Sequence, residues 1–156
     1  MTNQPQGISI LPFQSEYQSE VKNLVLNGLA EHWGTLDPTK NPDLNDIGLT
    51  YANAAFLVAW QNNKVIGTGA LVPKSNDTGE IVRMSVAADM RRKGIGRMIF
   101  QRLCEQAKSN GYKRLVLETT ETWHEVMEFY KQLGFQITHH LDGDVYFVLD
   151  ISKVNE

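Results

Sequence analysis

Residues 80–98 predict a strand that leads through a basic, glycine-spaced loop into a helix. The strand is expected over Glu80–Val86, with Val82, Met84 and Val86 on one face and Ile81, Arg83 and Ser85 on the other. The helix is expected to begin at about Gly94. The first turn of a helix has free N–H groups, and the helix dipole attracts negative charge to that end. The stretch therefore predicts a binding site for a phosphate group.

Basic residues and glycines gather around the expected helix start. The basic residues are Arg91, Arg92, Lys93 and Arg97. Gly94 and Gly96 have no Cβ, so the oxygens of a ligand could approach their backbone closely. A nucleotide-triphosphate loop is excluded because the required Lys-Ser/Thr after two spaced glycines is absent, and a dinucleotide fingerprint lacks its third glycine. Two interpretations stay open, namely a seat for a pyrophosphate-bearing cofactor and a plain helix start with surface arginines.

The whole chain has the composition of one ordinary globular domain, expected over residues 1–156. A net charge of −3 argues against a general nucleic-acid binder. A single cysteine, Cys104, excludes an internal disulfide, and its place in the helix after Gly94 favours a buried hydrophobic role. The sequence has neither an apolar run of membrane-spanning length nor a signal-peptide pattern. We therefore expect a cytoplasmic protein that binds no membrane.

The remaining pattern predicts an α/β or α+β sheet with helices packed on it. Further strands are expected over Ile8–Phe13, Ala55–Gln61, Val65–Val72, Leu115–Leu117, Phe135–Leu141 and Val145–Ile151. Further helices are expected after a cap at Ser15 and over Trp123–Leu133. The segment His32–Asn53 has no clear period, and such an irregular stretch is often a lid or a substrate wall.

A second motif gives the glycine loop a specific meaning. Arg91-x-x-Gly94-x-Gly96 is followed by a helix, a strand and then Phe129-Tyr130-Lys131-Gln132-Leu133-Gly134-Phe135. In this order and separation, the two motifs resemble the GNAT superfamily of acetyl-CoA-dependent N-acetyltransferases, over Glu80 to about Leu149. The resemblance implies a mixed, mostly antiparallel sheet of about seven strands with about four helices, splayed at the cofactor strand. Members of that family often form homodimers through their C-terminal strands, so the resemblance also implies a possible homodimer.

The resemblance assigns roles to residues of this sequence and requires no metal. Acetyl-CoA would be the co-substrate, with its pyrophosphate at Arg91, Arg92, Lys93, Gly94, Ile95, Gly96 and Arg97. The backbone of Met84, Ser85 and Val86 would hold the pantetheine arm and the acetyl carbonyl. Tyr130 would protonate the departing thiolate, and Glu80 would take a proton from the attacking amine.

The chain departs from the family pattern at one helix. Trp123 stands where many relatives have an asparagine that contacts the pantetheine arm, and Val126 stands where a small alanine is usual. Trp123 could instead cover the cofactor or face the substrate.

The predicted reaction is direct attack of a primary amine, on a small molecule or a peptide, in a ternary complex. Asp37, Asp43 and Asp46 make the irregular segment acidic, which favours a cationic amine. The alternative is a non-catalytic module that binds acetyl-CoA as a sensor or scaffold.

Overall fold

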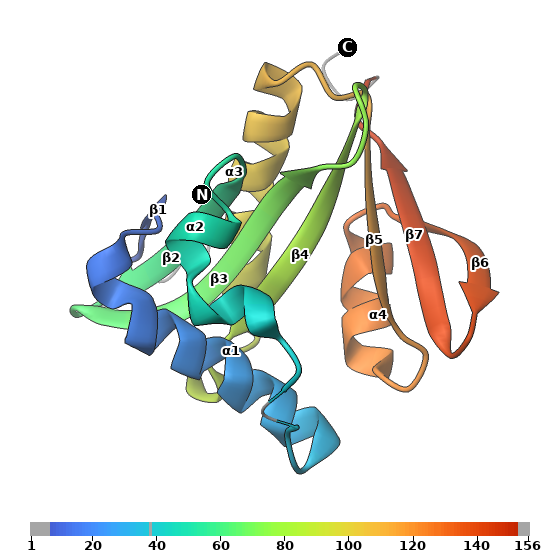
Figure 1. Ribbon diagram of the computed structural model, residues 1–156. Helices are drawn as coiled ribbons and strands as arrows, with labels where there is room; N and C mark the ends of the chain where they lie inside the picture. The colour runs from blue at the N-terminus through green and yellow to red at the C-terminus, as the bar shows by residue number, and fades with distance from the viewer. Residues whose placement is uncertain (1–6, 38, 153–156) are drawn as a thin grey trace.

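A seven-stranded mixed sheet forms the centre of the molecule, in a computed structural model that describes residues 7–37 and 39–152 (Figure 1). The strands are β1 (Ser9–Pro12), β2 (Ala55–Gln61), β3 (Lys64–Pro73), β4 (Thr78–Val86), β5 (Arg114–Thr120), β6 (Gln136–Leu141) and β7 (Asp144–Asp150). Their spatial order is β1-β2-β3-β4-β5-β7-β6. β4 and β5 pair in parallel, and the other neighbours pair antiparallel. The expected mixed, mostly antiparallel sheet is confirmed.

Helices cover both faces of this sheet. They are α1 (Gln18–Trp33), α2 (Ile47–Thr50), α3 (Ile95–Ser109) and α4 (His124–Gln132), with 3-10 turns η1 (Ser15–Tyr17), η2 (Pro42–Asn45) and η3 (Ala88–Met90). α1 and α2 lie on one face of β2–β4, and α3 lies on the other (Figure 1). α4 packs on β5 and β7 on the same side as α3. The expected cap at Ser15 is wrong, because a 3-10 turn occupies Ser15–Tyr17 and places Tyr17 against the Trp60 ring before α1 begins.

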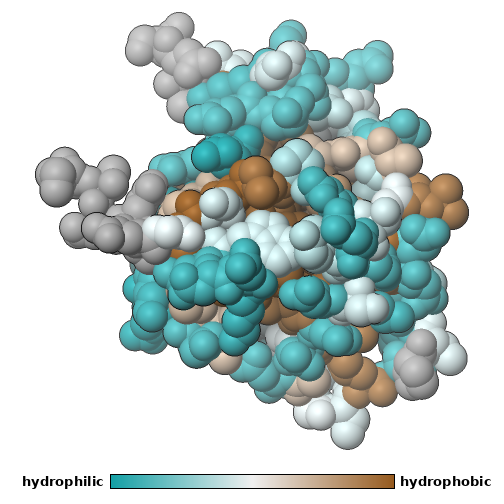
Figure 2. Space-filling view, turned by 90° about the vertical axis from the view of Figure 1, so that its left-hand side faces the viewer, coloured by the Kyte–Doolittle hydropathy of each residue, from teal (hydrophilic) through white to brown (hydrophobic). Residues whose placement is uncertain are grey.

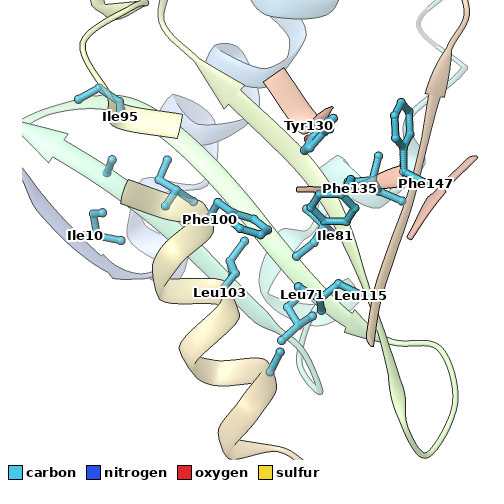
Figure 3. Packing of buried hydrophobic residues seen from close by; sticks show 14 of the residues in the cluster. Ile10, Leu71, Ile81, Ile95, Phe100, Leu103, Leu115, Tyr130, Phe135 and Phe147 are labelled. Atoms are coloured by element: carbon cyan, nitrogen blue, oxygen red, sulfur yellow. The ribbon is translucent and has the colours of Figure 1, made fainter. Parts of the chain in front are cut away.

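The described apolar side chains form two clusters, one on each face of the sheet. The cluster under α1 and α2 contains Val21, Val25, Leu44, Ile47, Phe56, Val58, Val65 and Ala70. The larger cluster joins α3 and α4 to the sheet, and Figure 3 shows Leu71, Phe100 and Leu103 pointing toward one another within it. The predicted apolar stripe of α3, which is Ile95, Ile99, Leu103 and Ala107, is at most 1% exposed. Local periodicity therefore identified the helix face that covers the sheet.

A β-bulge in β4 makes the expected alternation of its side chains wrong. Thr68 pairs with Ser85 and Ala70 pairs with Val82, so two residues of β4 lie opposite Gly69. Arg83, one of these two, has a φ of 55°. An extra residue in a strand reverses the faces beyond it. Val82 packs on the α1 side, whereas Ile81, Met84 and Val86 all pack on the α3 side.

The face of the molecule beyond β1 is largely hydrophilic, with separate apolar patches (Figure 2). Leu11 in β1 is one exposed apolar residue, with 49% of its surface accessible. Across the described ranges, every helix is too short or too polar to span a lipid bilayer.

Candidate active site

The sheet splays between β4 and β5. These strands pair only from Thr78 opposite Arg114 to Glu80 opposite Val116. Beyond that point β4 stays paired with β3 and β5 stays paired with β7, so the two halves of the sheet separate (Figure 1). The backbone edge of β4 from residue 81 onward therefore lacks a strand partner on its β5 side. The expected splay at this strand is confirmed.

The basic loop leads from the splayed strand to the start of α3. Gly94 is the N-cap residue and has a φ of 82°, a conformation that favours glycine. Ile95, the first residue of the helix, is 1% exposed and packs in the α3-side cluster. The side chains of Arg92, Lys93 and Arg97 are exposed. The predicted helix start and its concentration of positive charge are both present.

Arg91 has a different environment from the other basic residues of the loop. Its guanidinium donates to both carboxylate oxygens of Glu31 on α1, at 2.9 and 3.0 Å. Its Nε also donates to the carbonyl of Val86 at 3.1 Å. Arg91 therefore joins the end of α1 to the end of β4, in addition to bringing charge to the loop.

The side chains of the three residues expected to bind the thioester, Met84, Ser85 and Val86, pack against the helices on the two faces of the sheet. A Cβ built on Gly28 of α1 would lie 3.0 Å from Ser85 Oγ, so Ser85 faces α1. Met84 and Val86 pack on the opposite face, against the α3-side cluster. Their backbone groups run along the splayed part of the strand. The prediction that these backbones bind the pantetheine arm stays a prediction.

Tyr130 lies in an aromatic cluster on α4. It is 6% exposed, and its ring centroid is 5.2 Å from that of Phe129 and 5.6 Å from that of Phe135. Figure 3 shows it in the same group of side chains as Phe135 and Phe147. Burial raises the pKa of the Tyr130 phenol above its ordinary value. The phenol therefore keeps its proton at neutral pH, as a proton donor must.

Glu80 lies at the last pair of residues before the splay. It is opposite Val116 of β5, and its carboxylate is 3.9 Å from Lys74 Nζ. Since Val82 packs under α1, alternation places Glu80 on that same face. Its side chain is 20% exposed, so it is accessible to solvent.

A second carboxylate lies across the splay from Glu80 and was missed by the sequence reasoning. Glu118 of β5 lies opposite Tyr146 of β7, on the face turned away from the buried Leu117. Although Glu118 is exposed, partial desolvation and the neighbouring Asp144 raise its pKa above the ordinary value, and the charge of Glu80 adds to the shift. A polar residue directly after the apolar run Leu115–Leu117 was the only sequence signal for it.

Trp123 connects the two halves of the molecule. Its ring stacks on His32 of α1 with centroids 4.4 Å apart and planes 10° apart. The next residue toward the N-terminus, Thr122, has its Oγ1 3.2 Å from His32 Nε2. The end of α1 and the start of α4 are therefore in contact across the splay. The residue that replaces the usual asparagine serves as part of this bridge.

The three aspartates of the irregular segment all have partners within the chain. Asp37 accepts from Thr39, Asp46 accepts from the N–H of Leu49, and Asp43 binds Arg83. The acidity of this segment is therefore weaker evidence for a cationic acceptor than its composition indicated. The described residues include no group of three metal-ligating side chains.

A comparison with protein families matches residues 19–135 to the model described as "Acetyltransferase (GNAT) family". The chain belongs to the GNAT acetyltransferase family. The sequence-based assignment is confirmed, and the match extends it to α1 and the irregular segment, which lie before Glu80.

Curated relatives of this GNAT chain are named as acetyltransferases. It is 35% identical over 83 residues to the uncharacterized N-acetyltransferase YsnE of Bacillus subtilis, which covers 52% of this chain and 55% of that protein. It is 31% identical over 124 residues to the IAA acetyltransferase of Azospirillum brasilense, covering 78% of this chain and 80% of that protein. The match to rat N-acetyltransferase 8F1 covers 47% of that protein, so the chain spans about half the length of some relatives.

Solved structures share the fold at low sequence identity. A GNAT-family acetyltransferase from Staphylococcus aureus aligns with a TM-score of 0.85 at 21% identity, over 92% of this chain and 99% of that one. The PaiA N-acetyltransferase from Thermoplasma acidophilum, solved in complex with coenzyme A, aligns with a TM-score of 0.80 at 18% identity, over 92% and 98%. At these identities the alignments show the fold alone.

Proposed function

We propose that this chain transfers the acetyl group of acetyl-CoA to a primary amine of a small molecule or peptide, by direct attack in a ternary complex. The observation that carries the proposal is the splay of β4 from β5 directly above the basic start of α3. The splay leaves an unpaired strand edge for an extended arm, and the helix start offers N–H groups and positive charge for phosphates. One ligand with both parts is an acyl-coenzyme A, and the Thermoplasma relative of the same fold was solved with coenzyme A.

The cofactor seat follows from this arrangement. The pyrophosphate accepts from the N–H groups of Ile95, Gly96 and Arg97, while Arg92 and Lys93 supply charge. Arg91 reaches the phosphates only by sharing its guanidinium with Glu31, so its contribution is smaller than that of its neighbours. The backbone of Met84, Ser85 and Val86 holds the pantetheine arm and polarises the acetyl carbonyl. Donors aimed at the developing oxyanion lower the barrier to attack.

Tyr130 is the proposed general acid. Its neutral phenol protonates the thiolate of coenzyme A as the tetrahedral intermediate collapses. Replacing Tyr130 by Phe lowers turnover and leaves the affinity for acetyl-CoA nearly unchanged, because the ring and its packing remain. Tyr112→Phe is the matched control, since the Tyr112 ring lies at the opposite, paired end of β4, 2.9 Å from where a Cβ on Gly79 would stand. An unchanged rate for Tyr130→Phe across the pH profile would remove it from the mechanism.

Glu80 is the proposed general base, and Glu118 is a second candidate. Both carboxylates lie beside the point where the strands separate, on the face away from α3. A base must be deprotonated, so the rate rises with pH through the pKa of the group that serves. Glu80→Gln and Glu118→Gln are therefore compared by pH–rate profile, and the variant that loses the acidic limb identifies the base. Retention of that limb in both variants would exclude both residues.

The acceptor approaches on the α1 side of the splay, where it meets Glu80 and Glu118. This placement favours an amine with positive charge nearby. A homodimer through the C-terminal strands and a cytoplasmic location remain predictions of the same proposal.

The decisive experiment is a calorimetric titration of the protein with acetyl-CoA and with coenzyme A, followed by a thiol-release assay over a panel of amines. Binding plus thiol release supports the enzyme. Absence of binding to either cofactor refutes the proposal. Binding without thiol release from any amine favours the alternative, a non-catalytic acetyl-CoA sensor or scaffold.

A further inference from the structure

Arg83 adopts a backbone conformation that arginine normally avoids. Its φ of 55° lies in the left-handed region, where the Cβ of a non-glycine residue is crowded. It occupies the extra position of the β4 bulge, opposite Gly69. This one residue decides that Met84 and Val86, which follow it, pack on the same face as Ile81. The conformation of Arg83 therefore sets the orientation of the proposed thioester-binding backbone.

A carboxylate from forty positions earlier holds the Arg83 side chain. Asp43 of η2 accepts two hydrogen bonds from its guanidinium, at 2.9 Å to Nε and 2.6 Å to a terminal nitrogen. Asn41 accepts another at 3.1 Å. The Tyr51 hydroxyl donates to Asp43 at 2.6 Å, and the Thr68 hydroxyl donates to the carbonyl of Arg83 at 2.7 Å. Both the side chain and the backbone of Arg83 are thus held by neighbours.

The pair is shielded from water and is charged at neutral pH. The side chains of Arg83 and Asp43 are 19% and 24% exposed. Burial raises the pKa of Asp43, but hydrogen bonds from Arg83 and Tyr51 outweigh this and leave it below its ordinary value. A planar guanidinium bound by two parallel hydrogen bonds has a fixed orientation as well as a fixed position. A lysine at position 83 could not be held in this way.

We propose that Asp43 is a positioning residue for acetyl transfer, which holds Arg83 in the bulge and thereby presents the Met84–Val86 backbone to the thioester. Asp43 belongs to the irregular segment that was predicted to be a lid or a substrate wall, so the same contact ties that segment to the cofactor strand. The inference rests on the proposed function. It does not require Asp43 to touch either substrate.

The test is a double-mutant cycle with acetyl-CoA as the probe, read by calorimetry. Asp43→Asn removes the negative charge and one of the two oxygens that accept hydrogen bonds from Arg83. We expect it to weaken acetyl-CoA binding by about tenfold, a typical coupling for contacting residues. Arg83→Gly keeps the left-handed conformation without an anchor, because glycine adopts it freely. In the Arg83→Gly background, Asp43→Asn therefore has no further effect. If Asp43 merely stabilised the fold, Asp43→Asn would still weaken acetyl-CoA binding in the Arg83→Gly background.

Controls separate this inference from failure of the fold or of the proposed function. Asp77→Asn breaks another Asp–Arg pair, with Arg114 at 3.1 Å near the opposite end of β4, and leaves acetyl-CoA affinity unchanged. Tyr51→Phe removes one hydrogen bond to Asp43 and gives a smaller loss of affinity, which keeps the test available if Asp43→Asn does not fold. If the wild-type protein fails to bind acetyl-CoA, the proposed function is wrong.

Two outcomes overturn the inference while leaving the proposed function intact. One is wild-type affinity in Asp43→Asn or, if that variant does not fold, in Tyr51→Phe. The other is an equal loss of acetyl-CoA affinity when Asp43→Asn is made in the wild-type protein and in the Arg83→Gly variant. That result would mean that Asp43 does not act through Arg83.

Discussion

Gly69 allows β3, β4 and α3 to approach closely, and replacing it by alanine gives a sharp test of the packing beneath the site. A Cβ at this position would lie 2.5 Å from Met84 Sδ, 2.6 Å from Ile99 Cγ2 and 3.2 Å from Leu103 Cδ1. The thioether of Met84 can move aside. Ile99 and Leu103 are both 0% exposed, so neither side chain can move out into solvent. The substitution must therefore displace α3, β4 or both.

The expected loss of stability follows from overpacking. Forcing an extra carbon into a filled core costs about 1–3 kcal/mol, reduced by the roughly 0.5–1 kcal/mol that alanine gains over glycine within a strand. The net loss of up to about 2.5 kcal/mol lowers the melting temperature of a chain of this size by about 2–4 °C for each kcal/mol. Denaturant titration at one temperature measures the free energy of unfolding directly.

Gly48 provides a matched control with the opposite sign. It lies within α2, and a Cβ there would meet Phe13 Cε2 at 3.7 Å, an ordinary contact. Gly48→Ala therefore stabilises the protein by about 0.5–1 kcal/mol, because glycine is a poor helix former.

Gly69→Ala should also weaken acetyl-CoA binding, because the methyl group pushes against Met84 at the bulge. If Gly69→Ala has wild-type stability and wild-type acetyl-CoA affinity, then β3, β4 and α3 are not packed as described. An acetyl-CoA affinity that is no lower for Gly69→Ala than for Gly48→Ala would also contradict the argument.

Three further predictions concern single side chains. Leu103→Ala lowers the free energy of unfolding by about 2–5 kcal/mol, because Leu103 is fully buried between α3 and the sheet, and denaturant titration measures the loss. Glu118→Gln raises the melting temperature at neutral pH. The pKa of Glu118 is higher in the folded state than in the unfolded state, so its ionised form opposes folding. The higher melting temperature of the variant therefore disappears as pH falls below the ordinary carboxyl range. An equal advantage at acid pH would refute the cause given for the shift. Cys104 reacts with iodoacetamide far more slowly in the folded protein than in urea at pH 8, because burial raises its pKa to about 11.

Much of the fold could be predicted because its signals are local. Ile95, Ile99 and Leu103 recur at helical spacing, and the turn at Asn62-Asn63 separates two apolar runs, so α3 and the β2–β3 hairpin were placed within a residue or two. The start of α3 was also located, since glycine and basic residues mark it directly in the sequence. Tyr130 was found through its motif, which also contains Phe129 and Phe135, but its contact with Phe147 depends on β7, a separate strand later in the chain.

The errors and omissions have a common cause, which is contact between distant segments. The alternation of β4 failed at Arg83, because the left-handed residue there is held by Asp43, far away in the chain. Glu118 was missed, because its environment comes from Asp144 and Tyr146 of β7. Arg91 was expected to serve only the loop, whereas Glu31 of α1 also binds it.

For residues 80–98, the sequence alone determined the order of strand, basic loop and helix. Together with the second motif at Phe129–Phe135, it also determined the family to which the chain belongs. Hydrophobic period, glycine spacing and charge are properties of neighbouring residues, and they can be read without a fold. Tertiary structure alone decided how the residues of β4 are oriented along the unpaired edge of the splay and which carboxylates lie beside it. Those features arise from strand register and from ion pairs between segments forty or more positions apart, and no local pattern encodes them.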